Sequence, residues 1–141
     1  MIEPTKTSIW LKNPYTRPVI AGTFAPSINR QERFMARIVE NVYIAPLQGK
    51  TRAQQIARLK EWKKFWLSTG AEKVTVHEVG PGNIEAAWLF AIHHKSGAAY
   101  GTGIDEYYKN TKAYDAINEK WQKTPVFDIK TYAVTFEIDE I

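Results

Sequence analysis

Three histidines, His77, His93 and His94, are the side chains best suited to chemistry, because an imidazole can exchange protons near neutral pH. The chain has no cysteine, so a thiol nucleophile and a thiolate zinc site are excluded. We take His77 as the candidate general base. Asn41 is the candidate for orienting a substrate or stabilising an oxyanion. These residues point to acid–base chemistry without a cofactor.

A metal site is the alternative use of the histidines. A catalytic zinc or iron ion usually takes three protein ligands. His93 and His94 are neighbours in an expected strand, however, and adjacent strand residues point to opposite faces of a sheet. At most two of the three imidazoles can converge, so we expect no metal and no other cofactor.

The histidines belong to an expected β-hairpin, whose strands are residues 73–80 and 86–94, joined by the turn-forming run Gly80-Pro81-Gly82-Asn83. The pairing register decides which side chains share a face. We predict the register in which the numbers of paired residues sum to an odd number. One face then carries Val74, Val76, Ala87, Leu89 and Ala91, and the other carries Thr75, His77, Trp88, Phe90, Ile92 and His94. The opposite register would place Val76 beside Trp88 and His77 beside Leu89, which mixes a histidine into the small aliphatic set.

Two helical segments flank the hairpin. Residues 51–69 predict a core-facing helix, which Thr51 and Gln54 cap as a capping box and Gly70 ends. Its apolar stripe consists of Ile56, Leu59, Trp62 or Lys63, and Trp66, with Phe65 at the border. Residues 96–123 predict a second helical segment with Ser96 as its N-cap and a restart near Asn110.

A strand is expected at each end of this unit. Residues 36–45 alternate, with Ile38, Val42 and Ile44 on one face and Arg37, Val39, Asn41 and Tyr43 on the other. Glu40 interrupts the apolar side. A helix from Arg30 is the competing interpretation, but Pro46 favours an extended chain before it. The last strand is expected at residues 129–138.

The order strand, helix, strand, strand, helix, strand predicts an α+β fold of the ferredoxin-like βαββαβ plan with an antiparallel sheet. We assign this domain to residues 36–141. Residues 1–35 form an irregular arm that contains four of the seven prolines, namely Pro4, Pro14, Pro18 and Pro26. We expect the arm to pack across the domain or onto a partner subunit.

The formal net charge is +4, and the densest group of basic residues is Arg58, Lys60, Lys63 and Lys64. They flank the apolar stripe of the first helix, which is typical of a solvated helix face, so we expect no nucleic-acid partner. The longest apolar runs are far shorter than the roughly 20 residues of a membrane-spanning helix. We therefore expect a cytoplasmic protein without a membrane partner.

Three runs carry a family resemblance: PLQGKTRAQQIARLKEWKKFWLSTGAEKVTVHEV, AAWLFAIHHKSGAAYGTGIDEYY and AYDAINEKWQK. The pattern is a glycine before the first helix, Gly-Ala after it, Ser-x-x-x-Tyr-Gly after a strand, and a tryptophan late in the last helix. It resembles the dimeric α/β barrel superfamily, whose members are small ferredoxin-like proteins. The resemblance implies a homodimer in which two sheets close a barrel, with a pocket in each protomer between sheet and helices.

The resemblance leaves the activity open, since the superfamily includes cofactor-free monooxygenases, haem-degrading enzymes, lactone isomerases and proteins with no known catalysis. Haem-degrading members have an asparagine on the first strand, an aromatic residue ending the third, and an iron-ligating histidine on the second helix. Asn41 matches the first position, and His94 or its neighbour occupies the second. Residues 96–123 contain no histidine, so haem degradation is not expected unless His77 or His94 is the ligand.

We therefore expect a small-molecule pocket on the open face of the sheet, serving a cofactor-independent, monooxygenase-like reaction on an apolar or aromatic compound. His77 and Asn41 would be catalytic, and Tyr43, Trp88, Phe90 and His94 would bind the substrate. The alternative is a non-catalytic dimeric module, with a structural or stress-response role, in which the same aromatic residues fill the barrel. In either case an open face this apolar predicts an obligate homodimer.

Overall fold

The structure is a computed structural model that describes residues 35–138, except for the side chain of Tyr107. The expected N-terminal arm, apart from Met35, lies outside the described residues. The described strands form one antiparallel sheet in the order β2-β3-β1-β4. They are β1 (Ile38–Pro46), β2 (Lys73–Glu78), β3 (Trp88–His94) and β4 (Phe127–Phe136), and the helices are α4 (Arg52–Ser68), α5 (Gly97–Lys109) and α6 (Thr111–Lys123). The described chain is an α+β protein whose element order is compatible with the ferredoxin-like plan.

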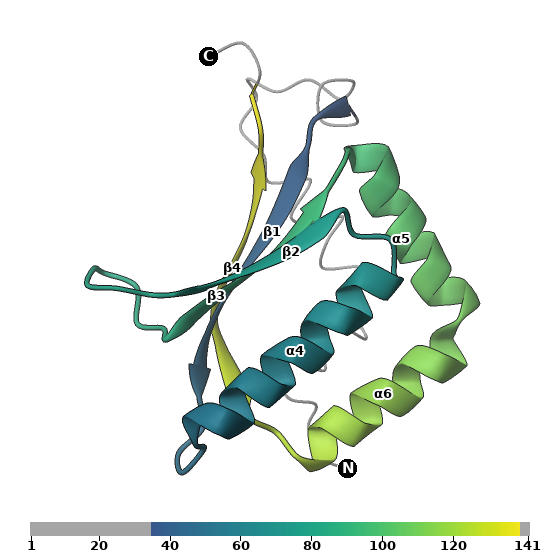
Figure 1. The fold of residues 1–141 in the computed structure, drawn as a ribbon. Coiled ribbons are helices and arrows are strands. Elements are labelled where there is room, and N and C mark those ends of the chain that lie inside the picture. Colours follow the sequence, from purple (N-terminus) through teal and green to yellow (C-terminus); the bar gives the residue numbers. More distant parts are fainter. Residues whose placement is uncertain (1–34, 139–141) are drawn as a thin grey trace.

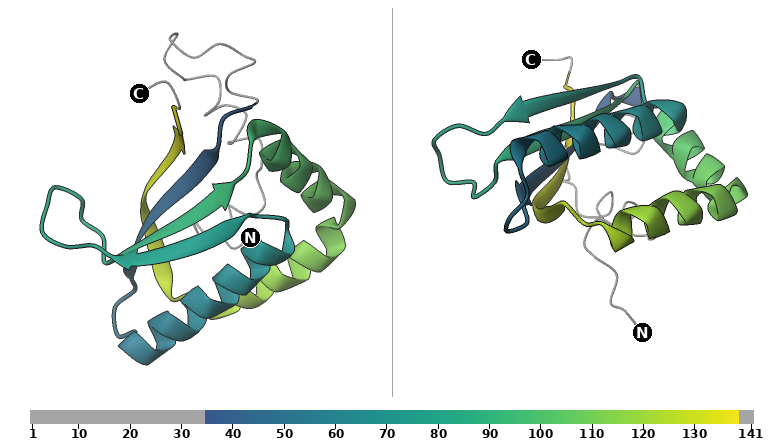
Figure 2. Two further views of the ribbon diagram at one scale, coloured as in Figure 1. Left: turned by 45° about the horizontal axis from the view of Figure 1, so that its top comes forward. Right: turned by 60° about the horizontal axis from the view of Figure 1, so that its bottom comes forward.

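The helices lie on one face of the sheet, and the described chain places no helix on the other face (Figures 1 and 2). We call these the helix side and the open face. A long loop, residues 79–87, joins β2 to β3 and extends away from the body of the molecule (Figure 1). The sheet thus presents two different environments to its side chains.

Local signals fix the ends of α4 as predicted. The Thr51 hydroxyl accepts a hydrogen bond from the Gln54 amide at 3.2 Å, and the Gln54 side chain accepts one from the Thr51 amide at 2.9 Å. This is the expected capping box. Gly70, just past the helix, has a φ of +100°, a left-handed conformation that favours glycine.

The second helical segment is two helices that meet at Asn110, where the restart was predicted. The Ser96 hydroxyl accepts a hydrogen bond from the Ala99 amide at 3.1 Å and so caps α5. α6 then packs against α4, with the rings of Tyr114 and Trp121 edge-on to Phe65 at 5.3 and 5.4 Å. α5 lies beside the end of β3.

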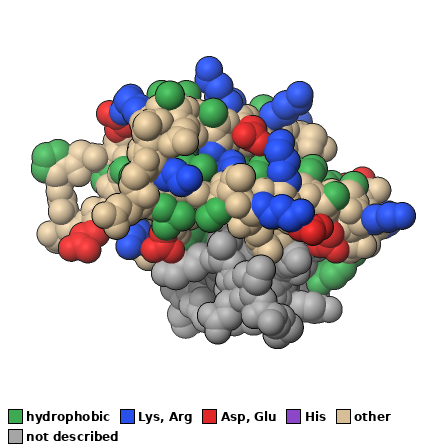
Figure 3. Space-filling model, turned by 90° about the horizontal axis from the view of Figure 1, so that it is seen from below, with side chains coloured by type: hydrophobic (Ala, Val, Ile, Leu, Met, Phe, Trp, Pro, Cys, Tyr) green, Lys and Arg blue, Asp and Glu red, His purple; other side chains and the backbone are tan. Residues whose placement is uncertain are grey.

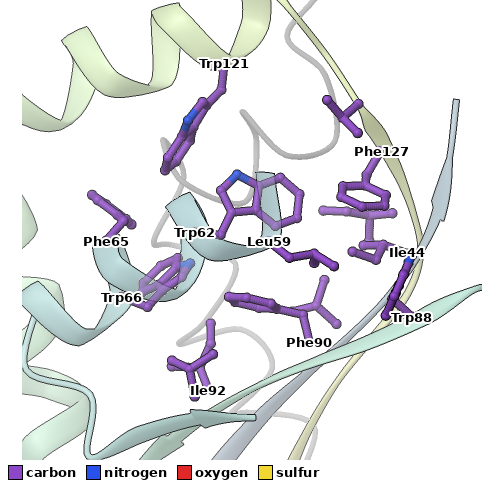
Figure 4. Close-up of a cluster of buried hydrophobic side chains, with 14 of the residues drawn as sticks. Ile44, Leu59, Trp62, Phe65, Trp66, Trp88, Phe90, Ile92, Trp121 and Phe127 are labelled. Carbon is purple, nitrogen blue, oxygen red and sulfur yellow. The ribbon is translucent and has the colours of Figure 1, made fainter. Parts of the chain in front are cut away.

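Trp62 lies at the centre of the core between α4, α6 and the sheet (Figure 4). Its ring is 1% exposed and lies 5.8 Å from Phe90, 6.2 Å from Trp121 and 5.5 Å from Phe127, measured between centroids. Offset and edge-to-face aromatic contacts of this kind add to the free energy of burial. The predicted apolar stripe of α4 is confirmed, with Trp62 rather than Lys63 facing the core.

The predicted register of the hairpin is wrong. In the structure Val74 pairs with Ile92, Val76 with Phe90 and Glu78 with Trp88, so paired numbers sum to an even number. Trp88, Phe90 and Ile92 consequently point to the helix side, where each is at most 7% exposed. The physical reason is area: these three side chains bury much more apolar surface than Ala87, Leu89 and Ala91, at about 25 cal/mol per Å². His77 is then paired with Leu89 on the open face.

A candidate acid–base site

The sheet separates the six residues that the sequence predicted as a pocket. Asn41, Tyr43 and His77 lie on the open face, whereas Trp88, Phe90 and His94 lie on the helix side. β1 and β3 pair so that Asn41 is opposite Ala91 and Tyr43 is opposite Leu89. The six residues therefore do not line one cavity.

Trp88 and Phe90 contribute to the core instead of lining an open pocket. Phe90 is fully buried against Trp62. The Trp88 indole donates a hydrogen bond to the Gln55 side chain at 3.0 Å, and the guanidinium of Arg52 lies over its ring at 5.1 Å. Both rings thus fix α4 on the sheet.

On the open face, Asn41 is engaged with its own sheet. Its Nδ2 lies 3.2 Å from the carbonyl oxygens of Val39 and Ala133, and 3.1 Å from the hydroxyl of Thr135. An amide group that donates to the backbone in this way holds β1 to β4, and it would have to leave these acceptors to stabilise an oxyanion. His77 is exposed on the edge strand β2. Neither residue is held as a catalytic group is usually held.

The helix side brings together three groups that the sequence did not combine: Glu40 of β1, His94 of β3 and Tyr132 of β4. His94 Nε2 lies 2.7 Å from Glu40 Oε2, and the Tyr132 hydroxyl donates to Glu40 Oε1 at 2.6 Å. β1 is central, with β3 and β4 as its neighbours, so diagonal cross-strand neighbours can reach the same carboxylate. We call these three residues the Glu40 cluster.

Two groups of the Glu40 cluster are buried, and this makes its hydrogen bonding important. Glu40 is 0% exposed and His94 is 6% exposed. A buried carboxylate is costly unless hydrogen-bond donors satisfy its oxygens. Here each oxygen has a donor at a distance typical of charge-assisted hydrogen bonds. Glu40 is accordingly best described as an ionised acceptor that receives hydrogens from both neighbours.

An ionised Glu40 requires the tautomer of His94 that carries its hydrogen on Nε2. If Nε2 donates its hydrogen to Glu40, Nδ1 keeps the lone pair and is the ring nitrogen that can take up a proton. The carboxylate then stabilises the positive charge that develops on the ring, as the acid of a catalytic triad does. Tyr132 holds the other oxygen and keeps the carboxylate in place. The geometry of the cluster is therefore compatible with a general base.

Partly exposed apolar and aromatic groups border the cluster. Tyr100 of α5 meets the His94 ring edge-on, with centroids 5.2 Å apart and an interplanar angle of 69°. Tyr100, Tyr132, Val134 and Phe136 are each only half-buried. These half-buried groups give the cluster an apolar border on the helix side of β4.

Sequence reasoning missed Glu40 and Tyr132 as functional candidates. The signal was present, because Glu40 was the charged residue that interrupted the apolar side of an otherwise regular strand. A charge at a core position of a central strand requires a partner. Only the order of strands in the sheet shows that His94 and Tyr132 are those partners.

His93 lies on the opposite face of the sheet from His94. Its Nε2 lies 3.0 Å from the Thr75 hydroxyl, which belongs to the neighbouring strand β2. Burial, followed by the positive charge of Lys73, lowers the pKa of His93 below its ordinary value. The two adjacent histidines therefore lie in separate sites, with His94 almost fully buried and His93 half-buried.

Among residues 35–138, no group of three or more histidine, cysteine or acidic side chains is arranged to hold a metal ion. No helix in this range is both long enough and apolar enough to cross a membrane. Viewed from below, Lys and Arg side chains are scattered among apolar and acidic ones (Figure 3).

Comparisons with family models, with curated proteins and with solved structures give no match to this chain. The site must therefore be interpreted from its own geometry. The likeness to the dimeric α/β barrel superfamily stays a proposal.

Proposed function

We propose that the protein binds a small apolar or aromatic compound on the helix side of the sheet and removes a proton from it, with His94 as the general base. The observation that carries this proposal is the fully buried Glu40 carboxylate, held between His94 and Tyr132 by two short hydrogen bonds. A buried ionised group is rarely the most stable choice for a core position, and such groups concentrate at functional sites.

The chemistry follows from the groups present. Nδ1 of His94 takes the proton, Glu40 stabilises the imidazolium, and Tyr132 fixes the carboxylate. The electron pair stays on the substrate, which must delocalise it into a carbonyl group or an aromatic ring. A deprotonated, electron-rich substrate is also what a cofactor-independent oxygenation needs, so a monooxygenase-like reaction fits this site. The half-buried apolar border around Tyr100 and Phe136 favours a substrate of the same character.

Proton–deuterium exchange tests the base without knowledge of the full reaction. The protein would be incubated in D₂O with a panel of aryl ketones and hydroxyaromatic compounds, and loss of the acidic C–H signals followed by NMR. We expect catalysed exchange for at least one compound, and a loss of about 100-fold or more in His94→Gln, as is usual when a general base is removed.

His77→Gln is the discriminating variant, because His77 is the base that the sequence predicted and lies exposed on the other face. Retained exchange in His77→Gln with loss in His94→Gln supports the proposal. The reverse result would return the base to the open face. Urea unfolding of both variants separates lost chemistry from lost folding.

A non-catalytic module is the second candidate, and one observation favours it. Trp88, Phe90 and Ile92 are packed into a continuous core, as expected of a domain whose aromatic residues only stabilise the fold. In that case the Glu40 cluster would serve structure alone. No compound in the panel would then exchange faster with protein than without it.

A homodimer is also part of the proposal. The apolar residues expected to drive it, Trp88, Phe90 and Ile92, are in the core, but Tyr43 and Leu89 remain half-buried on the open face. Pairing two open faces would cover them and close a barrel. Sedimentation at micromolar concentration measures the assembly: a species of twice the 16.2 kDa chain supports the dimer, and a monomer excludes it.

A further inference from the structure

A cleft with a volume of about 400 Å³ lies at the end of the sheet where β1 begins and where β3 and β4 end. Four of its lining residues form one row across all four strands: Lys73 pairs with His93, His93 with Val39, and Val39 with Thr135. Residues in such a row project from the same face. The row lies on the open face, and the cleft extends around the strand ends to Ile38, His94 and Phe136 of the helix side.

The two cations that line this cleft, Arg37 and Lys73, differ in their ion pairs. Arg37 is held by two long ion pairs, to Glu72 at 3.6 Å and to Glu137 at 3.7 Å. Lys73 makes no ion pair within the described part of the chain. The lining thus carries two cations and two carboxylates, and both carboxylates engage Arg37, which leaves the ammonium of Lys73 as the cation available to a ligand.

The pKa of His93 reflects the electrostatic field in the cleft. The groups that act on its imidazole are Lys73, His77 and His94, which lower its pKa, and Glu72, which raises it. After burial, the positive charge of Lys73 is the largest of these effects. The imidazole thus experiences a net positive field, which is the environment that an anion prefers.

We propose that this cleft binds a small organic carboxylate, with its carboxylate group between Lys73, Arg37 and His93 and its apolar part over Val39. The carboxylate would pair with Lys73 and compete with the exposed carboxylates for Arg37. Because the cleft lies at the ends of the strands, it would open at a mouth of a barrel if two sheets pair. The cleft also reaches His94, but the binding of a carboxylate by Lys73 and Arg37 does not depend on the proton transfer proposed above.

Benzoate and benzylamine are suitable probes, because they share one shape and carry opposite charges. Each would be titrated into the full-length protein while the ring signals of the histidines are followed by NMR. We expect saturable shifts of the His93 signals with benzoate and an upward shift of the His93 pKa in its presence, since a bound anion favours imidazolium. Benzylamine should leave these signals unchanged.

Lys73→Gln is the decisive variant, and Lys64→Gln, on the exposed face of α4, is its matched control. We expect Lys73→Gln to weaken benzoate binding by about tenfold, the usual effect of losing one charge-assisted contact, and Lys64→Gln to leave it unchanged. Glu137→Gln should strengthen binding by releasing Arg37. Equal binding of benzylamine, or an affinity unaffected by Lys73→Gln, would overturn the proposal.

Discussion

The two faces of one sheet hold their polar groups in opposite ways. On the helix side, Glu40, His94 and Tyr132 are joined by hydrogen bonds of 2.6 and 2.7 Å, and two of the three groups are almost completely buried. On the open face, His93 has a hydroxyl neighbour at 3.0 Å, and Arg37 has carboxylates beyond 3.5 Å. The first set is tightly paired and largely buried, whereas the second is loosely paired and more exposed.

This difference shows how solvent decides what a polar residue requires. Where water is excluded, an unpaired group is costly, so each polar atom is matched and its position becomes fixed. Where water is present, a loose ion pair contributes little and can be exchanged for another partner. A buried cluster suits catalysis, which needs fixed geometry, and an exposed one suits reversible binding.

The largest expected difference in stability between the two faces comes from substituting neighbouring residues of β3. Phe90→Ala should lower the free energy of unfolding by about 3 to 5 kcal/mol, because it leaves a cavity beside Trp62. Leu89→Ala, on the half-exposed open face, should cost about 1 kcal/mol. Urea denaturation measures both, and equal losses would contradict the pairing of Val76 with Phe90.

The next largest loss of stability should come from removing the buried charge of Glu40. Glu40→Gln keeps the shape but weakens two charge-assisted hydrogen bonds, and we expect a loss of about 2 kcal/mol in the free energy of unfolding. Glu137→Gln, the matched change on the open face, should stay within about 0.5 kcal/mol. If the two variants were equally stable, Glu40 would not be the ionised acceptor described above.

Removing the hydroxyl of Tyr132 should have a smaller effect on stability. Tyr132→Phe removes one donor to Glu40 and should cost about 1 kcal/mol, since water can partly reach the half-buried position. Tyr43→Phe, on the open face, should change the stability little. Thermal unfolding of the two variants compares them, and a larger loss from Tyr43→Phe would reverse the assignment of the faces.

The smallest expected effect is the pH dependence that His93 contributes. Its pKa is lowered in the folded protein from an ordinary value of 6.5, so between the two values the unfolded chain binds more protons. The free energy of unfolding should therefore rise with pH through this window and level off above about 6.5. His93→Gln should flatten the profile there, as measured by urea unfolding between pH 5 and 7.5. An unchanged profile would mean that His93 titrates alike in both states.

Local elements were predictable because their signals are local. The capping box at Thr51, the left-handed Gly70 and the helix restart at Asn110 each depend on a few neighbouring residues. The alternation around Glu40 likewise placed β1 as a strand with the correct faces. These predictions needed no knowledge of distant contacts.

The hairpin register could not be read in the same way. The loop between β2 and β3 spans residues 79–87 and ends in a backbone hydrogen bond from Val79 to Ala87 at 2.9 Å. A loop of this length, unlike a two-residue turn, does not fix whether paired numbers are odd or even. The prediction avoided placing His77 beside aliphatic residues, whereas the area buried by Trp88 and Phe90 decided the outcome.

The sequence by itself determined the α+β class, the ends of the first helix, and the presence of one charged residue at a core position of β1. Only the tertiary structure decided which face of the hairpin is buried, and with it which histidine meets Glu40. The physical reason is that a strand exposes a different set of side chains when its register shifts by one residue, and the choice depends on the area buried against helices far away in the chain. Glu40, His94 and Tyr132 are separated by 54 and 38 residues along the chain, and they meet because β1 lies between β3 and β4.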